Sequence, residues 1–168
     1  MSWDSYQNFW DELTPEGYIL CFPRTETGLL PDHGEFGLDL RFLADKMQYE
    51  NFDTTSHFYG SISLKSAIMG HSMGGGASFL AAEYNSNITT LVNFAAAETN
   101  PSAIEASRNI YVPSLLFSGD DDCVTPPASH QDIMYDSLAT ACKTQICIIN
   151  GGHCYFANYN FNCSLGEF

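Results

Sequence analysis

The stretch "IMGHSMGGGAS" (residues 68–78) places a single serine among four glycines, directly after an apolar run. Glycine weakens strands and helices by about 1 kcal/mol each relative to alanine. The glycines surround Ser72 and are Gly70, Gly74, Gly75 and Gly76. A segment that served only packing would gain nothing from this loss. The sequence therefore predicts a tight turn that holds the hydroxyl of Ser72 in a defined place.

The apolar runs around this turn are of strand type, and they alternate with helical patterns. Expected strands cover 18–23, 66–71, 89–97, 113–119 and 144–150, and expected helices cover 5–13, 37–50, 73–84 and 128–139. Strands that are apolar throughout and alternate with helices indicate an α/β fold with a mostly parallel sheet and helices on both faces. Functional sites of such sheets lie at the carboxyl ends of the strands.

Composition limits the class of protein. The 168 residues are 45% hydrophobic and carry a formal net charge of −14. They predict a single α/β domain over residues 1–168, with no apolar run near the ~20 residues of a membrane span. The acidity argues against nucleic acid or an anionic membrane as a partner, because both require clustered Lys and Arg. The oligomeric state stays open.

Residues 70–74 form the pattern G-x-S-x-G, the nucleophile elbow, when they lie between a strand and a helix. The turn is so sharp that side chains two residues on either side of the serine would clash, so Gly70 and Gly74 are expected to be required. The N–H of Met73 opens the helix and is expected to stabilise an oxyanion. The alternative is a turn that serves packing alone.

A serine hydroxyl needs a base, and the base needs an acid to orient it. The expected order on this kind of sheet is Ser, Asp or Glu, then His. "LLFSGDDDCVTPP" follows one strand and offers Asp120, Asp121 and Asp122, while "IINGGHCYF" follows the last strand and offers His153. The predicted reaction is acyl transfer, in which Ser72 attacks an ester carbonyl and His153 accepts its proton. No metal spacing is present, and no cofactor is expected.

These motifs resemble the α/β-hydrolase family, in its dienelactone-hydrolase-like branch with chlorophyllase-like, cutinase-like and polyester-degrading enzymes. In that branch the acid lies four residues before a proline, which selects Asp122 with Pro126. The tail "NGGHCYFAN" is similar to the family's Gly-Gly-Ser-His loop, one residue shorter before His153. The resemblance therefore implies an α/β-hydrolase fold and the catalytic residues Ser72, Asp122 and His153.

The resemblance covers nearly the whole chain, but only the middle and late parts of the family's domain. The family's early strands and its C-terminal helix have no counterpart here. Met1 falls just after the loop that would supply the second oxyanion N–H. We expect the sequence to be a fragment lacking a strand between the segments 18–23 and 66–71, unless these two close up.

The substrate is less well determined than the chemistry. The segment "FAAAETNPSA" has Ala97 and Glu98 where polyester hydrolases often carry a tryptophan, which disfavours a polyester. Met73, Glu98 and His33 are expected to line the substrate site, and a small or medium-sized carboxylic ester is expected. Two alternatives remain: a catalytically silent domain that binds a ligand or partner, and a serine peptidase or acyltransferase of the same fold.

Six cysteines are many for a cytosolic chain. We expect disulfides 154–163 and 123–142, and hence an exported protein, secreted or periplasmic. Cys21 and Cys147 lie in apolar runs and are expected to be buried thiols.

Overall fold

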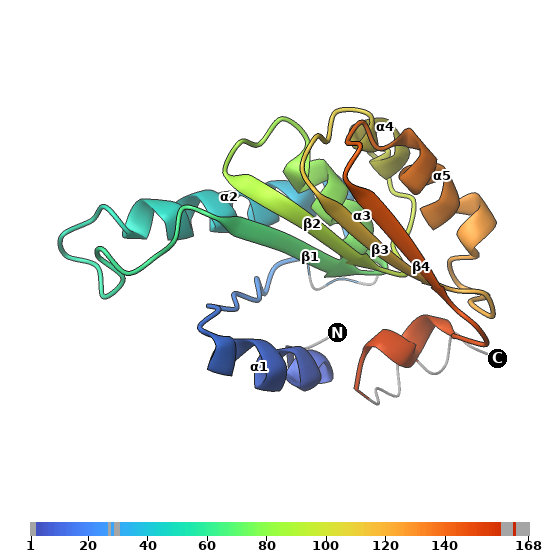
Figure 1. The fold of residues 1–168 in the computed structure, drawn as a ribbon, viewed down its shortest axis with the longest axis horizontal. Coiled ribbons are helices and arrows are strands. Elements are labelled where there is room, and N and C mark those ends of the chain that lie inside the picture. Colours follow the sequence, from blue (N-terminus) through green and yellow to red (C-terminus); the bar gives the residue numbers. More distant parts are fainter. Residues whose placement is uncertain (1–2, 27, 29–30, 159–162, 164–168) are drawn as a thin grey trace.

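The fold is built on a sheet of four parallel strands. The computed structural model describes residues 3–26, 28, 31–158 and 163 (Figure 1). The strands lie in the order β1-β2-β3-β4, and their bounds are Ser66–His71, Ile88–Phe94, Ser114–Gly119 and Lys143–Ile148. All three pairings are parallel, which confirms the expected sheet. The loops that follow the strands therefore leave the same edge.

One face of the sheet is covered by four helices, which lie above it in Figure 1. They are α2 (His33–Glu50), α3 (Met73–Ala82), α4 (Ala103–Ser107) and α5 (Gln131–Ser137). The main core fills the space between them and the sheet, with Ile68, Leu91 and Leu116 from the strands and Phe79 and Met134 from the helices. Burying side chains of this size stabilises the fold by about 1.5–3 kcal/mol each.

The opposite face is covered at its carboxyl end by both ends of the chain. There lie η1 (Trp3–Tyr6), α1 (Gln7–Leu13), η2 (Thr14–Glu16) and η4 (His153–Phe156), the last after the final strand. The rings of Phe9 and Phe94 have their centroids 4.9 Å apart, and those of Phe94 and Phe117 are 5.2 Å apart. Phe156 completes this cluster. Helices thus lie on both faces, as expected.

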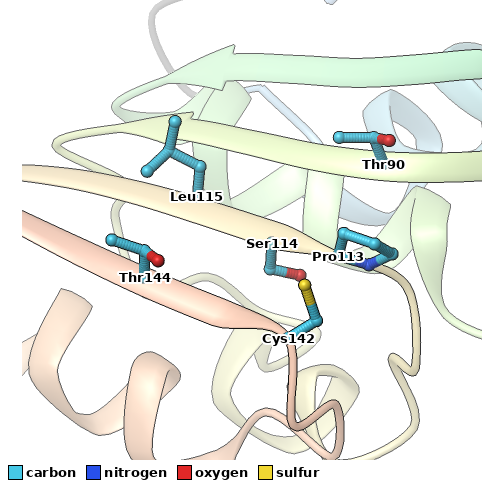
Figure 2. Close-up of a pocket in the computed structure, with 6 residues that line it drawn as sticks. All are labelled: Thr90, Pro113, Ser114, Leu115, Cys142 and Thr144. Carbon is cyan, nitrogen blue, oxygen red and sulfur yellow. The ribbon is translucent and has the colours of Figure 1, made fainter.

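The same face is hollowed at the amino ends of the strands. This hollow has a volume of about 230 Å³ and is lined by Thr90, Pro113, Ser114, Leu115, Cys142 and Thr144 (Figure 2). These residues lie at or just before the starts of β2, β3 and β4, away from the loops that follow the strands. Among the described residues its lining has no Asp, Glu, His, Lys or Arg side chain, and Cys142 contributes a thiol.

The strand expected over 18–23 is wrong, because the structure has no strand there. A strand needs a neighbour for its backbone N–H and C=O groups. Within the described residues, β1 pairs with β2 alone and no strand lies beside 18–23. Tyr18, Ile19 and Phe22 are exposed in consequence.

Helix α2 begins four residues before its expected start at residue 37. The carboxylate of Asp32 caps it by accepting a hydrogen bond of 3.0 Å from the N–H of Glu35. Asp32 and Glu35 have the spacing of a capping box, with the acidic residue three positions after the cap. The segment "DHGE" therefore carries a local signal for the start of the helix, four residues before the predicted start. In the part of the chain that is described, no helix has the length and apolar character needed to cross a membrane.

The cysteines differ from expectation in three places. Cys154 and Cys163 form a disulfide with Cα atoms 5.8 Å apart, as expected. Cys123 and Cys142 do not, and that expectation is wrong. Cys21 and Cys147 are exposed rather than buried, because residues 18–23 form no strand and the side chains of β4 are largely exposed.

Candidate active site

Ser72 forms the turn between β1 and α3. Its backbone has φ 58° and ψ −125°, a conformation that non-glycine residues rarely adopt and that costs about 1–3 kcal/mol. Three backbone hydrogen bonds hold it there. The N–H of Ser72 donates to Phe94 O at 3.1 Å, while its carbonyl accepts from Ala97 N at 2.9 Å and Gly76 N at 3.2 Å. The hydroxyl is thereby fixed at the carboxyl edge of the sheet.

The glycines of the turn differ in what they do. A Cβ on Gly70 would lie 2.1 Å from Gly74 O, and one on Gly75 would lie 2.7 Å from the Cβ of Ala96. Both positions therefore require glycine. A Cβ on Gly74 would meet only the ring of Phe36, at 3.7 Å, an ordinary contact. The expectation that Gly74 is sterically required is thus wrong.

Three side chains from different loops meet at this turn. His153 Nε2 lies 2.9 Å from Ser72 Oγ, and His153 Nδ1 lies 2.8 Å from Asp122 Oδ2. The side chains of His153 and Asp122 are buried. An ionised carboxylate only accepts hydrogen bonds, so Nδ1 carries the ring proton and Nε2 accepts from the serine hydroxyl. This arrangement can make the hydroxyl nucleophilic by general-base catalysis.

Asp122 is held ionised by its surroundings. Burial alone would raise the pKa of its carboxyl, but hydrogen bonds from His153 and Thr125 lower that pKa to about 2. Oδ1 accepts from the backbone N–H groups of Val124 and Thr125, both at 2.8 Å. The acid is therefore charged at neutral pH and can stabilise a protonated imidazole.

Sequence reasoning missed the part played by Thr125. Its hydroxyl lies 2.8 Å from Asp122 Oδ2 and 3.1 Å from His153 Nδ1. The signal that could have revealed it is its place three residues after Asp122. Asp side chains commonly accept from backbone N–H groups two and three residues on.

His71 supports the histidine loop from behind. Its Nε2 donates to the backbone carbonyl of His153 at 2.8 Å, and its Nδ1 accepts from the Tyr6 hydroxyl at 2.9 Å. Burial, with a smaller contribution from His153, lowers the pKa of His71 to about 4. Burial also raises the pKa of Tyr6. No local pattern could have indicated the contact with Tyr6, which lies 65 residues earlier in the chain.

Of the residues expected to line the substrate site, Met73 lies at the first turn of α3 next to Ser72, with its side chain 42% exposed. The carboxylate of Glu98 instead accepts from the N–H of Ile104, at 2.9 Å, in the first turn of α4. His33 begins α2, and its Nε2 is buried without a hydrogen-bond partner among the described residues. In the described part of the chain, no hydrogen bond or ion pair joins the side chain of Glu98 or His33 to the triad.

The remaining polar groups of the edge serve the loops. Asp120 Oδ1 accepts from Asn150 N at 2.6 Å and so ties the loop after β3 to the loop after β4. His130 Nδ1 accepts from Glu98 N at 2.8 Å, and burial lowers the pKa of His130. Within residues 3–158, apart from the gaps named above, no cluster of three or more His, Cys, Asp or Glu side chains could hold a metal ion.

Comparison with known proteins identifies the family of the chain. Residues 39–168 match the model of the PET hydrolase-like family (PETase). The chain is also 30% identical over 103 residues to "Cutinase est1" of Thermobifida alba. The aligned region covers 61% of this chain and 33% of that protein. The chain thus spans about one third of the length of that relative. The match extends over far more than half of the chain and confirms the cutinase and polyester-hydrolase branch: the chain belongs to the PET hydrolase-like family of α/β-hydrolases.

Proposed function

We propose that this chain is a serine hydrolase that cleaves small or medium-sized carboxylic esters by two-step acyl transfer. The observation that carries the proposal is the line of hydrogen bonds from Ser72 Oγ through the His153 ring to Asp122, 2.9 and 2.8 Å long. Membership of the PET hydrolase-like family and similarity to a cutinase support an ester as the bond that is cleaved.

In the first step Ser72 Oγ attacks the ester carbonyl carbon while His153 Nε2 takes the hydroxyl proton. Asp122 stabilises the imidazolium through Nδ1–H. The carbonyl oxygen gains the negative charge and accepts a hydrogen bond from the N–H of Met73, one of the helix N–H groups without an intrahelical partner. The imidazolium then protonates the alkoxy oxygen, the C–O bond breaks, and the alcohol leaves an acyl group on Ser72.

In the second step a water molecule replaces the alcohol. His153 takes one proton from the water as its oxygen attacks the acyl carbon. The tetrahedral intermediate then collapses with Ser72 Oγ as the leaving group, and His153 returns the proton to it. The carboxylic acid is released and the free serine is restored.

The residues beside Ser72 bear on the kind of ester. Met73 offers an exposed thioether side chain at the turn, and Ala97 is small and buried. Glu98 is occupied by Ile104. With no aromatic side chain at positions 97 and 98, a flat aromatic polyester has no ring to stack on there, so a soluble ester is favoured. The Cys154–Cys163 disulfide supports export from the cytosol, as a secreted or periplasmic protein.

The test is covalent labelling with a fluorophosphonate probe, read by peptide mass spectrometry. We expect modification at Ser72 in the wild-type chain and in Ser61→Ala, a control at an exposed serine. We expect none in Ser72→Ala or His153→Ala. Hydrolysis of p-nitrophenyl acetate and butyrate should follow the same pattern.

A folded wild-type chain that takes up no probe would contradict the proposal and favour a silent binding domain. Labelling at Ser72 combined with cleavage of amides, or with transfer to acceptors other than water, would move the assignment to a peptidase or acyltransferase.

A further inference from the structure

One residue of the acid loop contacts both oxygens of the catalytic carboxylate. The backbone N–H of Thr125 donates to Asp122 Oδ1 at 2.8 Å, and its hydroxyl lies 2.8 Å from Oδ2. Its side chain is buried, with 3% of the residue exposed. Since Oδ2 is also the oxygen that accepts from His153, Thr125 fixes the plane of the carboxylate that faces the ring.

The direction of the hydroxyl proton follows from its neighbours. A hydroxyl carries one proton, and the Thr125 hydroxyl has two acceptors, Asp122 Oδ2 at 2.8 Å and Ala95 O at 3.1 Å. The shorter contact is to an ionised group, which forms the stronger hydrogen bond. The hydroxyl therefore donates to Asp122. Its oxygen lies 3.1 Å from His153 Nδ1 and can present a lone pair to the N–H there.

We propose that Thr125 is a positioning residue of the triad, whose hydroxyl shares Asp122 Oδ2 with His153 and fixes the plane of the carboxylate against the ring. The inference rests on the proposed function, because it assigns Thr125 to the same reaction. No bond to Thr125 forms or breaks. It acts on the substrate only through Asp122 and His153.

Other titratable groups face this cluster. The ring of His71 lies 4.8 Å from that of His153 across the sheet edge. His130, next to Glu98, contributes electrostatically from the start of α5. His71, His130 and Glu98 are unchanged in every variant below. Differences between the variants at position 125 therefore report the effect of the Thr125 hydroxyl.

The test compares Thr125→Val, which removes the hydroxyl at nearly constant shape, with Thr125→Ser, which keeps it. Thr140→Val is the matched control, because Thr140 is also buried but accepts from Cys142 N near the start of β4. We expect Thr125→Val to lower kcat/KM about tenfold through kcat, the scale of one hydrogen bond to a charged group.

Thr125→Ser should keep kcat and kcat/KM within about twofold of the wild-type values, and Thr140→Val should leave both unchanged. A wild-type chain labelled at Ser72, together with a Thr125→Val variant of unchanged kcat, would overturn the Thr125 proposal and leave the proposed function standing. If Thr125→Val does not fold, Thr125→Ala removes the same hydroxyl with less bulk.

An unlabelled wild-type chain would instead overturn the proposed function, and a stability measurement then decides whether the contact exists. The loss of stability that Thr125→Val causes in urea unfolding should narrow as the pH falls from about 4 toward 2, because Asp122, whose pKa is about 2, loses its charge there. The deficit of Thr140→Val should not change. Equal behaviour of the two variants would show that the hydroxyl has no interaction with the charged carboxylate.

Discussion

Lowering the pH from 6.5 to 4 should destabilise this fold mainly through one buried side chain, His71, with a smaller contribution of the same sign from His130. In the folded chain its Nε2 donates to His153 O and its Nδ1 accepts from Tyr6, a pattern that suits the neutral ring. Burial lowers its pKa to about 4 from the ordinary value of 6.5. Between these two values the unfolded chain binds a proton at His71 and the folded chain does not.

The sign and size of the effect follow from this difference. The unfolded state binds more protons, so the free energy of unfolding increases with pH in this window. The stability that His71 contributes is complete above pH 6.5 and is lost as the pH falls toward 4. Each pH unit corresponds to about 1.4 kcal/mol, and the window therefore gives about 3 kcal/mol. This is a large share of the 5–15 kcal/mol that stabilises an ordinary domain.

The assay is urea unfolding followed by circular dichroism at half-unit steps from pH 7 to 4.5. We expect His71→Gln to lose most of the slope, because the amide can still donate to His153 O but does not titrate. His57→Gln should keep the wild-type slope, since His57 is exposed. Asp122 titrates below this window. Equal slopes in His71→Gln and wild type would refute the reasoning.

Three further predictions concern the fold. Gly70→Ala should lower the free energy of unfolding by about 3 kcal/mol or more, because its Cβ would lie 2.1 Å from Gly74 O. Gly74→Ala should be neutral or raise it by up to about 1 kcal/mol. Equal denaturation midpoints of the two variants would contradict this. Leu116→Ala, at a fully buried position in the main core, should cost about 2–5 kcal/mol in urea unfolding, and a loss below 1 kcal/mol would be inconsistent with that burial. Replacing Cys154 and Cys163 by serine removes a disulfide between residues nine positions apart and should lower the free energy of unfolding by about 3 kcal/mol. An unchanged melting temperature of the wild-type chain in reducing buffer would contradict this.

The strands and the elbow could be predicted because their signals are local. The apolar run at 66–71 gave the bounds of β1, and the glycine pattern around Ser72 gave the turn that follows it. The segment 18–23 has an equally apolar pattern and forms no strand. The pattern shows side chains that suit a strand, but a strand also depends on a neighbouring strand, which local sequence does not indicate.

The candidate site shows the same division between what is local and what is not. Motif order led to Ser72, Asp122 and His153, which the structure brings within hydrogen-bonding distance. It did not lead to Thr125 or Tyr6. The contacts of Thr125 with Asp122 and of Tyr6 with His71 depend on side-chain orientations in the folded chain, which local sequence does not give. The same holds for Gly74, whose supposed steric role depended on a Cβ direction that the pattern does not give.

Segments far apart in the sequence hold His153 in place. Its ring contacts Asp122 from the loop after β3, and its carbonyl is held by His71 at the end of β1. The next residue, Cys154, is joined to Cys163. Tyr6 reaches His71 from the other end of the chain. A base held from four separate segments stays aligned with Ser72 only while all of them are packed, so loosening any one should reduce turnover before it unfolds the sheet.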